Sequence, residues 1–73
     1  MTQTVTAAYD SELKARNAFD ELVSDGFPRE SLFLDEQARE LKVIIGDSAQ
    51  REVEEVLNRH EPAKLWSRPY PNE

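Results

Sequence analysis

His60 is the only histidine of this 73-residue chain and the residue best suited to acid–base chemistry. A histidine that acts as a general base needs a partner group and a pocket. No Gly-x-Ser-x-Gly segment is present, and Ser11, Ser31 and Ser48 stand at the expected starts of elements, where hydroxyls cap backbone N–H groups. We therefore interpret His60 as a partly buried residue near a helix C-terminus. The chain is predicted to have no catalytic residues and not to be an enzyme.

Metal and phosphate sites are not indicated either. The absence of cysteine and the single histidine leave no ligand set for zinc or copper. Two pairs of carboxylates, without the spacing of a calcium loop, are interpreted as solvated acidic surface. These pairs are Asp35 with Glu36 and Glu52 with Glu55. The segment Gly46-Asp47-Ser48 lacks the lysine of a phosphate loop, so we expect it to cap a helix and predict no bound cofactor.

The charge of the chain narrows its possible partners. Nine basic and 15 acidic residues give a formal net charge of −6. This charge repels phosphate backbones and anionic lipids, so we expect no nucleic-acid partner and no membrane partner. Residues 1–4 lack the basic and apolar regions of a signal peptide, and the longest apolar run, residues 43–45, is too short to cross a bilayer. A cytoplasmic location is the expectation.

Two helices are predicted from apolar residues recurring every three or four positions. The first spans residues 12–24, with Asp10 or Ser11 as its cap and Gly26 as its stop. The second spans residues 49–60. Asp47 and Gln50 have the spacing of a capping box at its start.

Four strands are predicted from runs of β-branched, aromatic and aliphatic residues. They span residues 4–9, 31–34, 40–45 and 63–67. The order strand, helix, strand, strand, helix, strand is that of a ferredoxin-like α+β domain, a βαββαβ two-layer sandwich with an antiparallel four-stranded sheet. We expect one such domain over residues 1–67 and a flexible tail over residues 68–73.

The N-terminal half also carries a family resemblance. Residues 8–12 read Ala-Tyr-Asp-Ser-Glu, residues 18–22 read Ala-Phe-Asp-Glu-Leu, and residues 23–32 continue Val-Ser-Asp-Gly-Phe-Pro-Arg-Glu-Ser-Leu. Aromatic–Asp–Ser, then Ala–x–x–Glu–Leu, then Gly–aromatic resembles the opening of the bacterial general stress, heat-induced protein family. The resemblance covers less than half of the chain. It implies a stress-associated bacterial accessory protein and supplies no catalytic residues.

The face of the sheet turned away from both helices is the candidate functional surface. Because side chains alternate along a strand, the outward set can be read from the sequence. It consists of Thr4, Thr6, Ala8, Phe33, Lys42, Ile44 and Trp66. Phe33, Ile44 and Trp66 are expected to form an exposed apolar patch, which commonly marks an interface. With Thr6 and Ala8 they are the predicted interaction residues. The central strands show no outward aromatic residue, so base stacking of the RNA-recognition kind is not expected.

Two alternatives remain for what covers this face. A second copy of the chain can cover it as a homodimer, through the face itself or by strand addition at a sheet edge. Alternatively, Trp66, Pro69 and Tyr70 of the C-terminal segment can fold across it. The leading hypothesis is a small non-enzymatic interaction module that acts as a homodimer. The alternatives are a small-molecule-sensing regulatory domain, although glycine-rich loops are absent from the strand–helix junctions, and a compact dimeric enzyme, for which no catalytic signature is seen.

Overall fold

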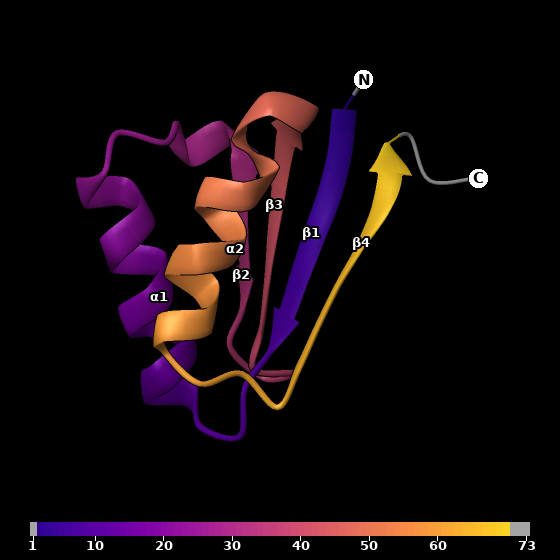
Figure 1. Ribbon diagram of the computed structural model, residues 1–73. Helices are drawn as coiled ribbons and strands as arrows, with labels where there is room; N and C mark the ends of the chain where they lie inside the picture. The colour runs from indigo at the N-terminus through magenta and orange to yellow at the C-terminus, as the bar shows by residue number, and fades with distance from the viewer. Residues whose placement is uncertain (1, 71–73) are drawn as a thin grey trace.

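Two helices pack on one face of a four-stranded antiparallel sheet in the computed structural model, which describes residues 2–70 (Figure 1). The elements are β1 (Thr2–Ala8), α1 (Glu12–Ser24), β2 (Leu32–Asp35), β3 (Glu40–Gly46), α2 (Gln50–Arg59) and β4 (Lys64–Tyr70), with short 3-10 helices at Arg29–Ser31 and Asp47–Ala49. The strand order is β2-β3-β1-β4, and each neighbouring pair is antiparallel. The predicted ferredoxin-like βαββαβ fold is therefore confirmed.

Helix α1 begins and ends at the residues that local signals predict. The Ser11 hydroxyl accepts the backbone N–H groups of Leu13 (3.1 Å) and Lys14 (3.3 Å). At the other end, Gly26 has φ +99°, and its N–H donates to the Val23 carbonyl at 3.1 Å. The next N–H, that of Phe27, donates to the Leu22 carbonyl at 3.1 Å, which completes a Schellman motif.

Helix α2 starts differently from the prediction. A 3-10 turn at Asp47–Ala49 leads into the helix, whose first residue is Gln50 and whose N-cap position makes no side-chain capping bond. The N-cap position is held by Ala49, so Asp47 is not the N-cap residue that the prediction assumed. The Gln50 amide instead donates to Glu54 (3.0 Å) and to the Ser67 hydroxyl on β4 (3.1 Å). Neither helix within residues 2–70 has the length and apolar content required to cross a membrane.

The core lies between the helices and the sheet, where the alternation of the central strands predicts it. Val5 and Ala7 of β1 and Leu41 and Val43 of β3 are fully buried, because their side chains point at the helices. The residues that the helices bury against them are Ala15, Ala18 and Leu22 of α1 and Val53, Val56 and Leu57 of α2. Burial of these aliphatic side chains is the main source of stability, at about 25 cal/mol for each Å² removed from water.

Strand β4 is longer than predicted. Residues 68–70, expected to belong to a flexible tail, continue the strand, and Tyr70 pairs with Thr2 at the far end of β1. Pro69 has no backbone N–H to donate, but β4 has a neighbour on one side only, so the missing donor need not interrupt the ladder. Trp66, Pro69 and Tyr70 therefore do not fold across the sheet. Residues 71–73 of the expected tail lie outside the described residues.

Candidate functional site

The sheet surface opposite the helices is here called the open face. It is formed by Thr2, Thr4, Thr6, Ala8, Phe33, Asp35, Glu40, Lys42, Ile44, Lys64, Trp66, Arg68 and Tyr70, which alternate along their strands with the core-facing residues. All five predicted interaction residues lie on it. Phe33 is 50% exposed, whereas Ile44 and Trp66 are partly buried by their neighbours.

The predicted apolar patch is not continuous. The strand register sets Phe33 opposite Lys42, Lys42 opposite Thr6, and Thr6 opposite Trp66. With about 4.8 Å between neighbouring strands, Phe33 and Trp66 lie about 14 Å apart at opposite edges of the sheet. Ile44 belongs to the next row, beside Thr4. The three residues share the predicted side of the sheet, but a cation and hydroxyl groups separate them.

Thr6 at the centre of this face is 3% exposed although no helix covers it. Its cross-strand neighbours are Lys42 on β3 and Trp66 on β4, so these two long side chains shield it from water. Within residues 2–70, no buried side-chain nitrogen or oxygen is left without a hydrogen-bond partner. Thr6 is therefore buried beneath its two neighbours rather than beneath a helix.

An open hollow of about 200 Å³ lies over β1. Its lining consists of Thr4, Thr6, Glu40, Lys42, Trp66 and Arg68. A wider depression of about 440 Å³ lies along β2, next to Phe33 and Lys42. The hollow is smaller than the 300–1,000 Å³ typical of ligand pockets, which suits the entry of a single side chain better than the enclosure of a metabolite.

The charged residues of the strands all lie on the open face, and they are arranged by sign. Asp35 and Glu40 are on β2 and β3, at the hairpin end of the sheet. Lys64 and Arg68 are on β4, at the opposite edge, with Lys42 between the two groups. Three cations and two carboxylates give this face a slight positive excess, in a chain whose net charge is −6.

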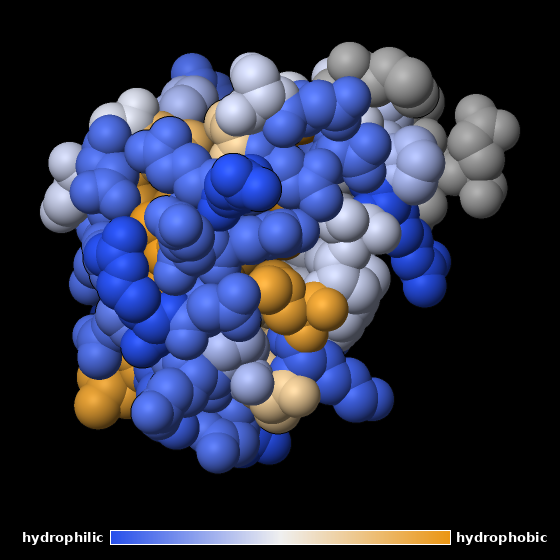
Figure 2. Space-filling view, in the orientation of Figure 1, coloured by the Kyte–Doolittle hydropathy of each residue, from blue (hydrophilic) through white to orange (hydrophobic). Residues whose placement is uncertain are grey.

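The helix layer exposes little apolar surface. Seen from that side, the surface is mainly hydrophilic, with small and separate hydrophobic areas (Figure 2). Leu13 on α1 is one exposed aliphatic residue of the helix layer, at 66% exposure. The helix layer therefore offers less for an apolar partner than the open face does.

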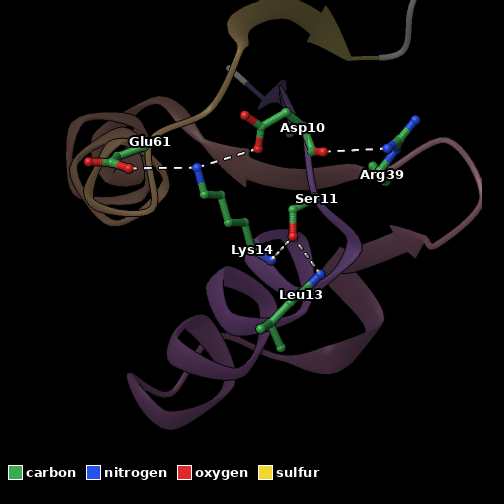
Figure 3. A network of polar contacts seen from close by, with 6 residues as sticks. All are labelled: Asp10, Ser11, Leu13, Lys14, Arg39 and Glu61. Carbon is green, nitrogen blue, oxygen red and sulfur yellow. Dashed lines mark hydrogen bonds and ion pairs between the residues drawn. The ribbon is translucent and has the colours of Figure 1, made fainter.

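The loops at one end of the sheet are joined by polar contacts (Figure 3). The Lys14 ammonium lies between the Asp10 carboxylate (3.4 Å) and the Glu61 carboxylate (3.6 Å), and so links the loops that follow β1 and α2. The Arg39 guanidinium donates to the Asp10 carbonyl at 3.4 Å, and this bond connects the β2–β3 hairpin to the loop after β1. These exposed contacts connect the loops to one another.

Of the two acidic pairs considered as cation sites, Asp35 and Glu36 are engaged in other contacts. The Asp35 carboxylate accepts the Ala38 N–H at 3.1 Å across the hairpin turn, and Glu36 pairs with Arg16 of α1. Within residues 2–70, no group of three or more acidic or histidine side chains is placed to hold a metal ion.

His60 lies at the C-cap of α2 and is partly buried, as its position in the sequence predicts. Its Nε2 atom is 2.7 Å from Oε1 of Glu21, and Arg59 contacts the other oxygen of the same carboxylate. One acidic residue of α1 thus joins both residues at the end of α2. The arrangement connects the helices, in keeping with the structural interpretation of His60.

Tyr9 is a buried polar residue to which the sequence analysis gave no role. It is 4% exposed, and its hydroxyl donates to the Leu57 carbonyl of α2 at 2.8 Å. Burial raises the pKa of the Tyr9 phenol well above its ordinary value of 10.0. The alternation of Val5 and Ala7 was the signal that could have placed Tyr9 under the helices, since it is the next residue on that side.

Comparisons with protein-family models, with curated proteins and with solved structures give no match to this chain, so its function is argued from the open face alone.

Proposed function

We propose that the protein is a small non-enzymatic interaction module whose open face binds a second copy of the chain. The observation that carries the proposal is the exposure of Phe33 on a helix-free sheet face that also bears Ile44 and Trp66. A half-exposed phenylalanine in water loses the free energy that burial would supply, and association recovers it.

The charge of the face favours the same chain as partner over an unrelated acidic one. In a homodimer the same face lies on both sides of the interface. That face therefore needs groups of both signs, placed so that unlike charges oppose each other. Asp35 and Glu40 on one side of the sheet and Lys64 and Arg68 on the other meet this requirement. A typical specific interface covers about 800 Å² on each partner, which is a minor part of the chain's 4687 Å² surface.

A stress-associated bacterial role, implied by the resemblance of the N-terminal half, is proposed only as the setting in which such a module would act. The residues that carry that resemblance form the cap, apolar stripe and stop of α1. Most of them lie in the helix layer, and Ala8 is the one that also lies on the open face. The role of this face is therefore tested independently of the setting.

Analytical ultracentrifugation at micromolar concentration tests the proposal. The chain is expected to sediment with twice its own mass, and Ile44→Glu, which places a carboxylate on β3 of the open face beside Thr4, is expected to shift it to the monomer. Leu13→Glu is the matched control, because it makes the same chemical change at an exposed site on α1. A monomeric wild-type chain, or a dimer that Ile44→Glu leaves intact, contradicts the proposal.

A further inference from the structure

The open face is ordered in rows that cross all or most of its strands. The row through the centre, from β2 to β4, contains Phe33, Lys42, Thr6 and Trp66. The row on the hairpin side contains Asp35, Glu40, Ala8 and Lys64, and the row on the other side contains Ile44, Thr4 and Arg68. The register therefore fixes which residues can meet when two such faces are stacked.

When two copies of a sheet stack with their strands aligned, the two-fold axis between them runs approximately parallel or approximately perpendicular to the strands. A perpendicular axis lays each strand on its own copy. In any register it stacks the basic strand β4, with Lys64 and Arg68, on the β4 strand of the partner subunit. It also stacks β2, with Asp35, on a second β2. Like charges would then oppose each other at both edges, which disfavours this arrangement.

A parallel axis exchanges the edges of the sheet, because the strand order β2-β3-β1-β4 reverses in the partner. Strand β2 then lies over β4 of the partner subunit, and β3 lies over its β1. Asp35 faces the partner's Lys64, and Phe33 faces the partner's Trp66. The acidic edge of each copy meets the basic edge of the other.

The hollow and the depression of the open face also fit the dimer with the parallel axis. Ile44 on β3 comes to lie over the partner's Thr4, which lines the hollow of about 200 Å³ on β1. Trp66 comes to lie over the depression of about 440 Å³ beside the partner's Phe33. Aligned sheets usually cross at about 30°, and the long side chains at the edges can span the offset that this rotation produces.

We propose that the dimer has its two-fold axis parallel to the strands, with Ile44 of each copy in the hollow of the other and Asp35 paired with the partner's Lys64. This inference rests on the proposed self-association and specifies its geometry. The contact is closed, since each copy uses the same surface, and it leaves both helix layers on the outside of the dimer.

Cross-linking of single-cysteine variants tests the orientation, and the absence of cysteine from the chain gives the experiment no background. Asp35→Cys and Lys64→Cys are prepared separately, one with a size tag, and treated with a short bismaleimide alone and after mixing. With sheets about 10 Å apart and strands about 4.8 Å apart, positions 35 and 64 of different copies lie about 10 Å apart in the proposed dimer. Two copies of position 35, or two of position 64, lie about 17 Å apart.

The expected result is a cross-linked product in the mixture only, of the size of one tagged and one untagged chain. The far-UV circular dichroism and sedimented mass of Asp35→Cys are checked first, because Asp35 also accepts the Ala38 N–H. Product from either variant alone, or no product from a mixture that sediments as a dimer, overturns the orientation while self-association stands. A wild-type chain that sediments as a monomer overturns both.

A charge substitution gives a second measurement that needs no cross-linker. Lys64→Glu is expected to weaken the dimer about tenfold, because two symmetric ion pairs become repulsive. Arg51→Glu on α2 makes the same change of net charge away from the open face and is expected to leave the dissociation constant unchanged. Equal effects of the two variants would assign the loss to net charge and contradict the proposed pairing.

Discussion

Replacing Tyr9 by phenylalanine removes one oxygen atom from the protein interior and leaves the ring in place. The Tyr9 hydroxyl, in a residue that is 4% exposed, donates to the Leu57 carbonyl at 2.8 Å. Without it, that carbonyl keeps only the longer bond from the His60 N–H, at 3.3 Å. A buried hydrogen bond contributes about 1 kcal/mol, so Tyr9→Phe is expected to lower the free energy of unfolding by about that amount at pH 7.

The effect of Tyr9→Phe is expected to reverse in sign at high pH. Burial raises the pKa of Tyr9 in the folded protein above the value of 10.0 that it has when unfolded. The phenol therefore favours the folded state fully below pH 10, and this stabilisation is lost above pH 10 as the unfolded chain ionises. At pH 11 the wild type loses about 1.4 kcal/mol that the variant keeps, because phenylalanine does not titrate. The variant should then be the more stable protein by a few tenths of a kcal/mol.

Urea unfolding followed by far-UV circular dichroism, at one protein concentration and at several pH values between 7 and 11, measures both effects. Tyr70→Phe is the control at neutral pH, since it removes a hydroxyl from a side chain that is 48% exposed. It is expected to change the free energy of unfolding by less than about 0.5 kcal/mol. The reasoning is refuted if Tyr9→Phe matches the wild type at pH 7 and the two stabilities fall in parallel above pH 10.

Three further substitutions test the contacts of the helices and the hairpin, each by urea unfolding. Gly26→Ala should lower the free energy of unfolding by about 1 kcal/mol, because φ of +99° is strained for an L-residue, although no atom lies within 4 Å of the added Cβ. An unchanged urea midpoint would contradict this expectation. Glu21→Gln should lower the free energy of unfolding by about 0.5–1 kcal/mol at low salt and by less in 1 M NaCl, because it weakens the contacts with Arg59 and His60. A loss of stability that does not depend on salt would argue against an ionic contribution. Arg39→Gly should raise the free energy of unfolding by up to about 1 kcal/mol, because glycine adopts the φ of +57° at this position without strain. A destabilised variant would contradict this expectation and would mean that the bond from Arg39 to the Asp10 carbonyl contributes more than the strain costs.

The parts of the fold that could be predicted are those set by local chemistry. Helix α1 has the predicted bounds because the Ser11 cap and the Gly26 stop act within a few residues of themselves. The core-facing residues followed from alternation, which fixes the side of a strand on which each residue lies. The strand order followed from the pattern of elements.

The parts that could not be predicted depend on residues distant in sequence. The end of β4 is set by Thr2 of β1, which gives Tyr70 a partner despite Pro69. Phe33 and Trp66 do not form one patch because β2 and β4 lie at opposite edges of the sheet, with Lys42 and Thr6 between them. The Lys14 contact with Glu61 likewise depends on where α1 lies relative to the loop that follows α2.

The place of β1 has a consequence for how the chain acquires its structure during synthesis. Strand β1 is a central strand that is synthesised before both of its neighbours, β3 and β4, which begin at Glu40 and Lys64. A ribosome therefore exposes β1 with neither partner, then with one, and supplies the second only when Tyr70 has left the exit tunnel. Pairings between such distant segments slow folding. Ribosome-bound chains from which residues 64–70 have not yet emerged should be digested by protease, whereas chains in which β4 has left the tunnel should resist it.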